Sequence, residues 1–311
     1  MELIRGQHNL KPHHRGCAVT IGAFDGVHLG HQAVLRHLRD QAETMAIPTT
    51  VVTFEPLPRE YLKPLQAPPR ITTLRDKWPL LEQCQVDRVL CLPFNNALRS
   101  LSARAFVERI FVDGLGVRYL AFGDDFRFGN QREGDLEYVR ALADEFGYAV
   151  APTPTLELAG ERVSSTRIRA ALAAAEFQQA AALLGREFEM AGRVLHGRKL
   201  GRELGTPTAN IALHRIRSPL QGVFAVRVWG GGLEAAPGVA NVGVKPTVSD
   251  SLEATLEVHV LEGSPDLYGR RLTVRFLHKL REEQKFPSLD ALKEGIAADK
   301  VAAREWLAAN G

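Results

Sequence analysis

The stretch that most constrains this chain is 22–31, which reads G-A-F-D-G-V-H-L-G-H. A β-branched run precedes it, and apolar residues at helical spacing follow over 32–45. Glycines in a strand-to-helix turn let the backbone approach a ligand closely, and the N–H groups of the first helical turn suit a phosphate. Histidines 28 and 31 share one face of that turn. The stretch therefore indicates a polyanion site, although glycine-rich turns also occur without any ligand.

Length and charge narrow the class of protein. A chain of 311 residues is long for one hydrophobic core, which predicts two domains. The formal net charge of +3 suits anionic substrates. No block of Lys and Arg with interleaved aromatic residues is present, so nucleic acid is not an expected partner.

Cysteine usage and hydropathy indicate the compartment. Cys17, Cys84 and Cys91 are widely spaced and form no C-x-x-C pair, which favours a reducing environment, small buried side chains and no structural zinc. The N-terminus has no apolar signal-peptide core, and no run approaches the roughly 20 apolar residues of a membrane span. The expected location is the cytoplasm, without a membrane partner.

The first half alternates strand-like and helix-like segments, which is typical of an α/β fold with a doubly wound parallel sheet. Ligands of such sheets bind beyond the carboxyl ends of the strands, so the loops after residues 22, 54 and 122 should share one edge. The expected strands are 18–21, 49–54, 86–92 and 117–122, and the expected helices are 32–45, 74–83, 103–112, 134–146 and 166–174.

The second half has a different texture, with glycines and short β-like pieces that favour an antiparallel sandwich or barrel. A final helix follows, with Ser288 as its N-cap. The expected strands are 188–195, 223–229, 237–242, 254–261 and 271–277. The helix should pack on the barrel through one apolar face formed by Leu289, Leu292, Ile296, Ala303 and Leu307.

Three further stretches carry polar chemistry. The loop 122–130, F-G-D-D-F-R-F-G-N, is either a ligand loop or a surface turn with its phenylalanines tucked inward. The segment 163–169, V-S-S-T-R-I-R, opens a helix that a serine can cap, and its hydroxyl and guanidinium groups also suit an anion. The run 197–211, G-R-K-L-G-R-E-L-G-T-P-T-A-N-I, could cradle phosphates or be a plain flexible loop, and it is not a P-loop.

The first-half motifs resemble the nucleotidyltransferase superfamily, whose signature is H-x-G-H, and F-D-G-V-H-L-G-H is similar to its flavin adenylyltransferase branch. The resemblance implies catalysis by His28 and His31. The implied nucleotide contacts are Gly22, Phe24, Asp25, Gly26, Gly30, Ser164, Ser165, Thr166 and Arg169. The implied flavin contacts in this half are Phe54, Pro56, Asp125, Phe126 and Phe128, and some members carry Asn where this chain has Asp125.

The second-half motifs resemble riboflavin kinases, whose signature contains G-x-P-T-A-N. G-V-F-A-V at 222–226, N-V-G-V-K-P-T at 241–247 and L-E-V-H at 256–259 are similar to further segments of that family. The resemblance implies a catalytic glutamate at Glu257, and magnesium-bound phosphates at Thr208 and Asn210, whose oxygens suit a hard cation. It also implies nucleotide contacts at Gly197, Gly201 and Pro207, and flavin contacts at Arg281 and Phe286.

Together the motifs cover residues 15–308 in the order of the bacterial bifunctional riboflavin kinase and FAD synthetase family. The resemblance implies a Rossmann-like adenylyltransferase domain at 1–184 and a Greek-key β-barrel kinase domain with a terminal helix at 185–311. The barrel would phosphorylate riboflavin to FMN, and the first domain would adenylylate FMN to FAD and release pyrophosphate. ATP would be the co-substrate of both steps and Mg²⁺ the cofactor.

Two alternatives stay open at the level of sequence. One is a nucleotidyltransferase for another phosphorylated substrate, such as a cytidylyltransferase, because H-x-G-H alone does not identify the substrate. The other is a flavin-binding regulatory module with an inactive kinase half. The sequence also leaves a transient homo-oligomer open.

Overall fold

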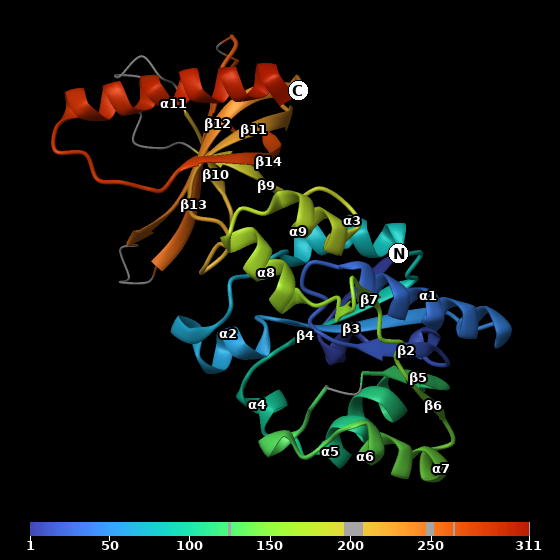
Figure 1. Cartoon of the computed structure of the whole chain (residues 1–311). Helices are drawn as coiled ribbons and strands as arrows, with labels where there is room; N and C mark the ends of the chain where they lie inside the picture. Colours follow the sequence, from blue (N-terminus) through green and yellow to red (C-terminus); the bar gives the residue numbers. More distant parts are fainter. Residues whose placement is uncertain (124–125, 196–207, 247–251, 264, 311) are drawn as a thin grey trace. The chain divides into compact units, whose positions relative to one another are not determined.

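The computed structural model describes residues 1–123, 126–195, 208–246, 252–263 and 265–310 (Figure 1). Contacts divide the chain into two compact units. The first comprises Met1–Pro68 and Lys77–Val163, and the second comprises Pro69–Asp76 and Ser164–Gly311. Helices α8 (Ser165–Ala173) and α9 (Phe177–Leu184) thus group with the second unit. The expected domain boundary between residues 184 and 185 stays a prediction.

The first unit is built on a six-stranded sheet in the order β1-β4-β3-β2-β5-β6, and every neighbouring pair is parallel. This arrangement confirms the expected α/β fold. The sequence pattern did not indicate the two edge strands, each of which is only four residues long. The strands are β1 (Glu2–Arg5), β2 (Ala18–Ile21), β3 (Thr49–Glu55), β4 (Arg88–Pro93), β5 (Tyr119–Phe122) and β6 (Ala149–Pro152).

Helices bury both faces of this sheet, which explains why its central strands read as continuous apolar runs. On one face, strand residues such as Val51 and Ala18 share hydrophobic clusters with α1 (Leu29–Thr44) and with α3 (Leu74–Gln83) from Lys77 onward. On the other face, the core includes residues of α5, η4 and α6. The remaining helical segments of this unit are α2 (Pro58–Leu62), α4 (Asn96–Arg99), α5 (Ala103–Phe106), η4 (Val107–Gly114), α6 (Leu136–Ala141) and α7 (Ala143–Phe146).

Strand order determines where a ligand can enter. β2 lies between β3 and β5, so the chain leaves β2 toward one side of the sheet and later returns to its other side. Such a switch point opens a crevice at the carboxyl ends of the strands. Because the three strands are parallel, the loops that follow Ile21, Glu55 and Phe122 lie at this same edge, as expected.

The second unit contains a closed barrel in the order β10-β13-β12-β11-β14-β9, in which all pairs are antiparallel. Its strands are β9 (Glu189–Leu195), β10 (Ala209–Ala212), β11 (Gly222–Gly230), β12 (Leu233–Pro246), β13 (Leu252–Val260) and β14 (Arg271–Arg281). The long terminal helix α11 (Leu289–Asn310) lies across the outside of this barrel (Figure 1).

The expected apolar face of α11 is partly correct. Ala303 and Leu307 are buried against barrel residues that include Ala225 and Leu261. Leu289, however, is 61% exposed, so its assignment to the packed face was wrong. The buried residues of α11 begin at Asp299, and Leu289 occupies the first turn, ahead of the part that packs on the barrel.

Candidate functional site

The turn after β2 has a strained backbone. Phe24 and Val27 have φ values of 46° and 40°, and Gly26 has a φ of 90°. Glycine adopts this region freely, but each non-glycine residue there costs roughly 1–3 kcal/mol, and a β-branched valine is a clear outlier. The side chains of Phe24 and Val27 are both buried in a cluster that contains Leu81 of α3. Packing therefore stabilises a conformation that the backbone alone disfavours.

The two histidines lie together at the start of α1. His28 is the N-cap, and its Nδ1 accepts a hydrogen bond from the His31 backbone N–H at 3.3 Å. The two rings stack with their centroids 3.6 Å apart. An Nδ1 that accepts a hydrogen bond leaves the proton of a neutral imidazole on Nε2. The cap thus fixes His28 as an Nε2 donor, which is the form that a phosphate oxygen requires.

The absence of a side chain at Gly30 leaves room for the His28 ring and for the backbone of Val163. A Cβ at this position would lie 3.1 Å from ring atoms of His28 and 3.2 Å from the carbonyl oxygen of Val163. Val163, the first residue of V-S-S-T-R-I-R, therefore lies against the start of α1 within the first unit. The buried Asp25 and the neighbouring Gly22 complete the expected nucleotide residues of this turn.

Aromatic side chains gather at the carboxyl ends of the strands. Phe54 and Phe128 are buried, and Phe128 belongs to the core, whereas Phe126 is half-buried and its ring stacks at 6.4 Å from that of Phe128. Pro56 is exposed directly after β3. The inward-tucked arrangement considered for the 122–130 loop thus holds for Phe128. Asp125 lies outside the described residues.

Two aromatic residues that the motifs did not single out extend this group. Phe94 packs edge-to-face against Phe54 with centroids 5.9 Å apart, and Tyr61 packs on Phe94 at 5.7 Å. Tyr61 comes from α2 and Phe94 follows β4. Only strand order brings them together with Phe54, so no local sequence pattern indicates them.

The V-S-S-T-R-I-R segment opens α8 as expected. Ser164 is its N-cap, since its Oγ accepts a hydrogen bond from the Arg167 N–H at 3.3 Å. Ser165 and Thr166 occupy the first turn, where backbone N–H groups are available to an anion. Arg169 Nε donates to the carbonyl oxygen of Pro69 at 2.6 Å, which holds its guanidinium in place.

Three polar side chains form one row across the barrel. Glu257 of β13 is the register partner of Asn210 on β10 and of Asn241 on β12. Register partners on adjacent strands share a face, with their Cβ atoms roughly 4.5–5.5 Å apart. Their neighbours along each strand, such as Ala209 and Val258, are buried, so the row lies on the outer face of the barrel.

This row brings together residues that the motifs treated separately. Asn241 was quoted within N-V-G-V-K-P-T without a role, and the register now places it beside the expected catalytic glutamate. Its Oδ1 is buried and has no hydrogen-bond partner among the residues that the structure describes. Thr208 directly precedes β10, whereas Gly197, Gly201 and Pro207 fall outside the described ranges. The hydroxyl and amide oxygens fit a hard cation that keeps several water ligands.

An ion pair joins the end of β14 to α11. Arg281 Nε and Nη2 donate to Asp299 Oδ1 and Oδ2, both at 2.7 Å, in a bidentate ion pair. The Arg281 guanidinium also lies 5.5 Å from the ring centroid of Phe286, and a Cβ at Gly295 would lie 2.5 Å from that ring. The two expected flavin residues of the kinase half are thus neighbours, held at the surface of the terminal helix.

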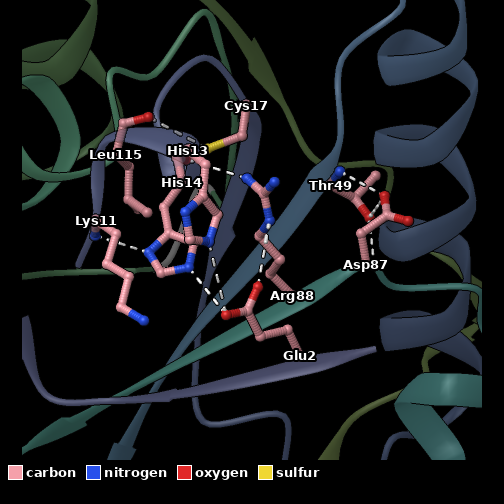
Figure 2. A network of polar contacts seen from close by, with 9 residues as sticks. All are labelled: Glu2, Lys11, His13, His14, Cys17, Thr49, Asp87, Arg88 and Leu115. Carbon is pink, nitrogen blue, oxygen red and sulfur yellow. Dashed lines mark hydrogen bonds and ion pairs between the residues drawn. The ribbon is translucent and has the colours of Figure 1, made fainter. Parts of the chain in front are cut away.

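A second polar cluster lies at the amino ends of the strands (Figure 2). His14 is buried, its Nε2 lies 3.0 Å from Glu2 Oε1, and His13 Nε2 lies 4.0 Å from the same oxygen. Arg88 Nη1 donates to the His14 carbonyl oxygen at 3.2 Å. Glu2, His13 and His14 bring ligand-type atoms within 4.8 Å of one another, which is the spacing of a metal site.

The hydrogen bonds of His14 argue against that use. Its Nδ1 accepts from the Lys11 backbone N–H at 2.9 Å, so the proton of the neutral ring resides on Nε2 and is donated to Glu2. A metal ligand needs a lone pair at that nitrogen. The hydrogen bond from His14, supported by the charge of Arg88, holds the pKa of the Glu2 carboxyl below its usual value. The contacts of this cluster therefore stabilise the position of β1 rather than bind a metal ion.

Comparison with known proteins decides the family. The FAD synthetase family model matches residues 10–167, and the riboflavin kinase family model matches residues 184–307. The bifunctional riboflavin kinase/FMN adenylyltransferase of Pseudomonas fluorescens is 56% identical over 98% of this chain and 97% of its own length. The chain belongs to the bifunctional riboflavin kinase/FMN adenylyltransferase family. The Escherichia coli K12 member is 46% identical over 98% of each chain.

One solved structure has a similar fold over almost the whole chain. The chain is similar to a Streptococcus pneumoniae protein solved under the name macrolide-efflux protein, with a TM-score of 0.75 and 29% identity over 98% of this chain and 99% of that one. In the described part of the present chain, no helix is both long and apolar enough to cross a membrane.

The family carries both expected activities in the expected order. The chain is a riboflavin kinase and an FMN adenylyltransferase, with riboflavin, FMN and FAD as substrates or products and ATP as co-substrate. This identification confirms the bifunctional hypothesis over the cytidylyltransferase and the inactive flavin-binding module.

Proposed function

We propose that adenylyl transfer takes place at the Gly22–His31 turn. The observation that supports this most directly is the stacked pair of His28 and His31, with the His28 tautomer fixed by its cap. An oxygen of the FMN phosphate forms a bond to the α-phosphorus of ATP, and the bond from that phosphorus to the bridging oxygen breaks as pyrophosphate leaves. The two histidines donate to α-phosphate oxygens as their charge develops.

The other nucleotide contacts belong to the same proposal. In the first unit, Gly22, Gly26 and Gly30 are proposed to let the backbone approach a phosphate. Ser164, Ser165, Thr166 and Arg169, at the opening of α8 in the second unit, are proposed nucleotide contacts in their own right. Phe54, Pro56, Asp125, Phe126 and Phe128 are proposed for the flavin, and the half-buried Phe126 offers more ring surface than the buried Phe128.

We further propose that Glu257 is the general base of the kinase. Its carboxylate accepts the proton of the 5′-hydroxyl of riboflavin while that oxygen forms a bond to the γ-phosphorus of ATP and ADP leaves. Asn210 and Asn241 flank Glu257 in the barrel row and supply amide groups on both sides of it. Arg281 and Phe286 are proposed to contact the flavin.

Thr208 and Asn210 would hold Mg²⁺ together with the ATP phosphates. When bound, Mg²⁺ neutralises charge on the phosphate oxygens. The support for this assignment is the oxygen donor set and the buried Asn241 Oδ1 in the same row.

We also propose a cellular setting from the composition. The three free cysteines and the need for ATP support a reducing cytoplasm. The modest net charge of +3 supports small anionic substrates rather than nucleic acid or a membrane surface. A transient homo-oligomer is compatible with both sites.

Two substitutions in the full-length enzyme test the division of labour. His31→Ala should reduce FAD formation from supplied FMN and ATP by about 100- to 1000-fold, because it removes one donor to the transition state, and leave FMN formation from riboflavin intact. Chromatography of both products is the measurement. A folded variant that lost both activities equally would contradict the assignment of adenylyl transfer to this turn.

Glu257→Gln is the reciprocal test, because it keeps the size of the side chain and removes the base. Riboflavin phosphorylation should fall by roughly 100- to 10,000-fold, while FAD formation from supplied FMN continues. Asn210→Asp keeps an oxygen ligand and adds a charge. It should change the Mg²⁺ concentration that gives half-maximal riboflavin phosphorylation without abolishing phosphorylation. Unchanged phosphorylation in Glu257→Gln would exclude Glu257 as the base.

A further inference from the structure

Helix α3 carries a lysine that is almost completely buried. Lys77 is 1% exposed, and its Nζ donates a hydrogen bond to the carbonyl oxygen of Ala23 at 2.6 Å. Ala23 is the second residue of the Gly22–His31 turn. Lysine is seldom buried unless its ammonium is paired, and its long side chain loses rotamer freedom when it is fixed. The sequence places Lys77 in a helix with no motif, so nothing there distinguishes it from a surface lysine.

The residue that Lys77 contacts precedes the strained part of the turn. Phe24 follows Ala23 directly and has a positive φ, as does Val27 three residues later. Leu81 lies four residues after Lys77, on the same face of α3, and belongs to the hydrophobic cluster of Phe24 and Val27. One face of α3 therefore engages the turn twice, through apolar packing of its side chains and through a charged donor to its backbone.

The apolar contacts and the hydrogen bond of α3 have different effects on the turn. Apolar packing buries Phe24 and Val27 but is not directional, whereas a short charge-assisted hydrogen bond fixes the position of one carbonyl group. The turn leads directly into the N-cap at His28, so the orientation of its backbone determines where the stacked imidazoles lie.

We propose that Lys77 is a positioning residue for adenylyl transfer, which holds the Gly22–His31 turn through the Ala23 carbonyl so that His28 and His31 meet the α-phosphate. The role rests on the proposed function of that turn. Lys77 acts through the backbone and does not itself touch the reacting atoms, so its loss should lower kcat for FAD formation more than it changes KM for FMN.

The test compares Lys77→Met with Lys77→Arg and Arg75→Met in the full-length enzyme. Methionine keeps a long apolar side chain in the buried site and removes the donor, whereas arginine keeps a donor. Arg75 is an exposed cation two residues earlier on α3, so its substitution controls for the loss of one positive charge. FAD formation from supplied FMN, riboflavin phosphorylation and thermal unfolding are measured for each variant.

Lys77→Met should lower kcat for FAD formation roughly 100-fold, because a displacement of about 1 Å can have that effect, and leave KM for FMN within about threefold. Lys77→Arg should recover part of kcat, and Arg75→Met should behave as wild type. Riboflavin phosphorylation supplies the internal control, because the barrel lies in the other unit. Wild-type kcat in Lys77→Met would overturn the proposal.

Chemical rescue separates positioning from stability. Propylammonium replaces the atoms that Lys77→Ala removes, so it should raise kcat for FAD formation, and tetramethylammonium at the same ionic strength should not. Equal loss of both activities with a lowered melting temperature and no rescue would assign Lys77 to stability alone and overturn the role. If His31→Ala retains FAD formation, the proposed function of the turn fails; if only Lys77→Met retains it, the positioning role alone fails.

Discussion

At the scale of single residues, Glu2 shows how a hydrogen bond becomes a dependence of stability on pH. The hydrogen bond from His14 is the largest cause that lowers the pKa of this carboxyl, and the charge of Arg88 acts in the same direction. A carboxyl whose pKa is lower in the folded than in the unfolded chain stabilises the fold when ionised. This stabilisation is present above the ordinary value of 4.5 and is lost as the pH falls through the lowered pKa.

Glu2→Gln should therefore lower the melting temperature at neutral pH, because the amide binds His14 without a charge. The difference from wild type should shrink as the pH falls below the ordinary value of 4.5. Thermal unfolding between about pH 7 and pH 3.5 measures it, with the exposed Glu82→Gln as the control. A difference that stayed constant across this range would mean that the charge of Glu2 makes no contribution.

At the scale of elements, the bidentate pair between Arg281 and Asp299 joins the end of β14 to α11. Asp299 is buried, and Arg281 is about one-quarter exposed. Asp299→Asn should destabilise the fold by about 1–3 kcal/mol, because it leaves the guanidinium without its charged partner. That loss corresponds to a melting temperature lower by several degrees.

The same variant tests the proposed flavin contact. If Arg281 orients riboflavin, Asp299→Asn should also raise KM for riboflavin, since the guanidinium loses its fixed position. Asp290→Asn is the matched control, because Asp290 lies on the same helix and its carboxylate is largely exposed beside Lys293. An unchanged KM with a lowered melting temperature would limit the pair to stability.

Element boundaries show what local sequence can and cannot specify. Ser164 and Ser288 cap their helices as expected, and Ser102 caps α5 in the same way, because a hydroxyl that accepts from the N–H three residues later makes a local contact. The first helix begins at Leu29 rather than at residue 32, because a histidine caps it and Gly30 lies inside its first turn. The predicted helix 134–146 is two shorter helices, α6 and α7, that meet at Leu142.

The residues of the candidate sites show the same difference between what local sequence specifies and what tertiary structure specifies. Motifs predicted His28, His31 and Glu257, since each is fixed by its immediate neighbours in sequence. The β10 strand and the row from Asn210 through Glu257 to Asn241 depend on the register of three strands, which no local pattern encodes. Lys77 was missed for a related reason: its burial follows from tertiary packing against a turn that lies more than fifty residues earlier.

At the scale of the whole molecule, the contacts of α9 bear on where the barrel unit begins. The ring of Phe177 packs on Phe224 and Phe276, with centroids 6.0 and 6.4 Å away. Phe224 and Phe276 are both buried. Arg215, also buried, donates to Asp76 at 2.9 Å and to the Arg70 carbonyl oxygen at 3.2 Å. The barrel is thus completed by segments on the amino side of residue 185.

Two fragments test the expected boundary between residues 184 and 185. A fragment of residues 164–311 retains α9, whereas a fragment of residues 185–311 exposes the surfaces of Phe224 and Phe276 that Phe177 covers. We expect the shorter fragment to be less stable by at least about 2–4 kcal/mol, because it lacks the Phe177 ring and the buried side chains of Leu183 and Leu184, and to bind a hydrophobic dye. Denaturant unfolding of the two fragments measures the difference.

Phe177→Ala in the full-length chain separates the ring from the rest of α9. It should lower the denaturant midpoint of the barrel by less than the removal of residues 164–184 does, because Ala180, Leu183 and Leu184 of α9 are buried as well. Both fragments lack Asp76, so Arg215 contributes equally to each and cancels from the comparison. Equal stability of the two fragments would instead support residue 185 as the start of an independent kinase domain, with α9 serving only as a connection.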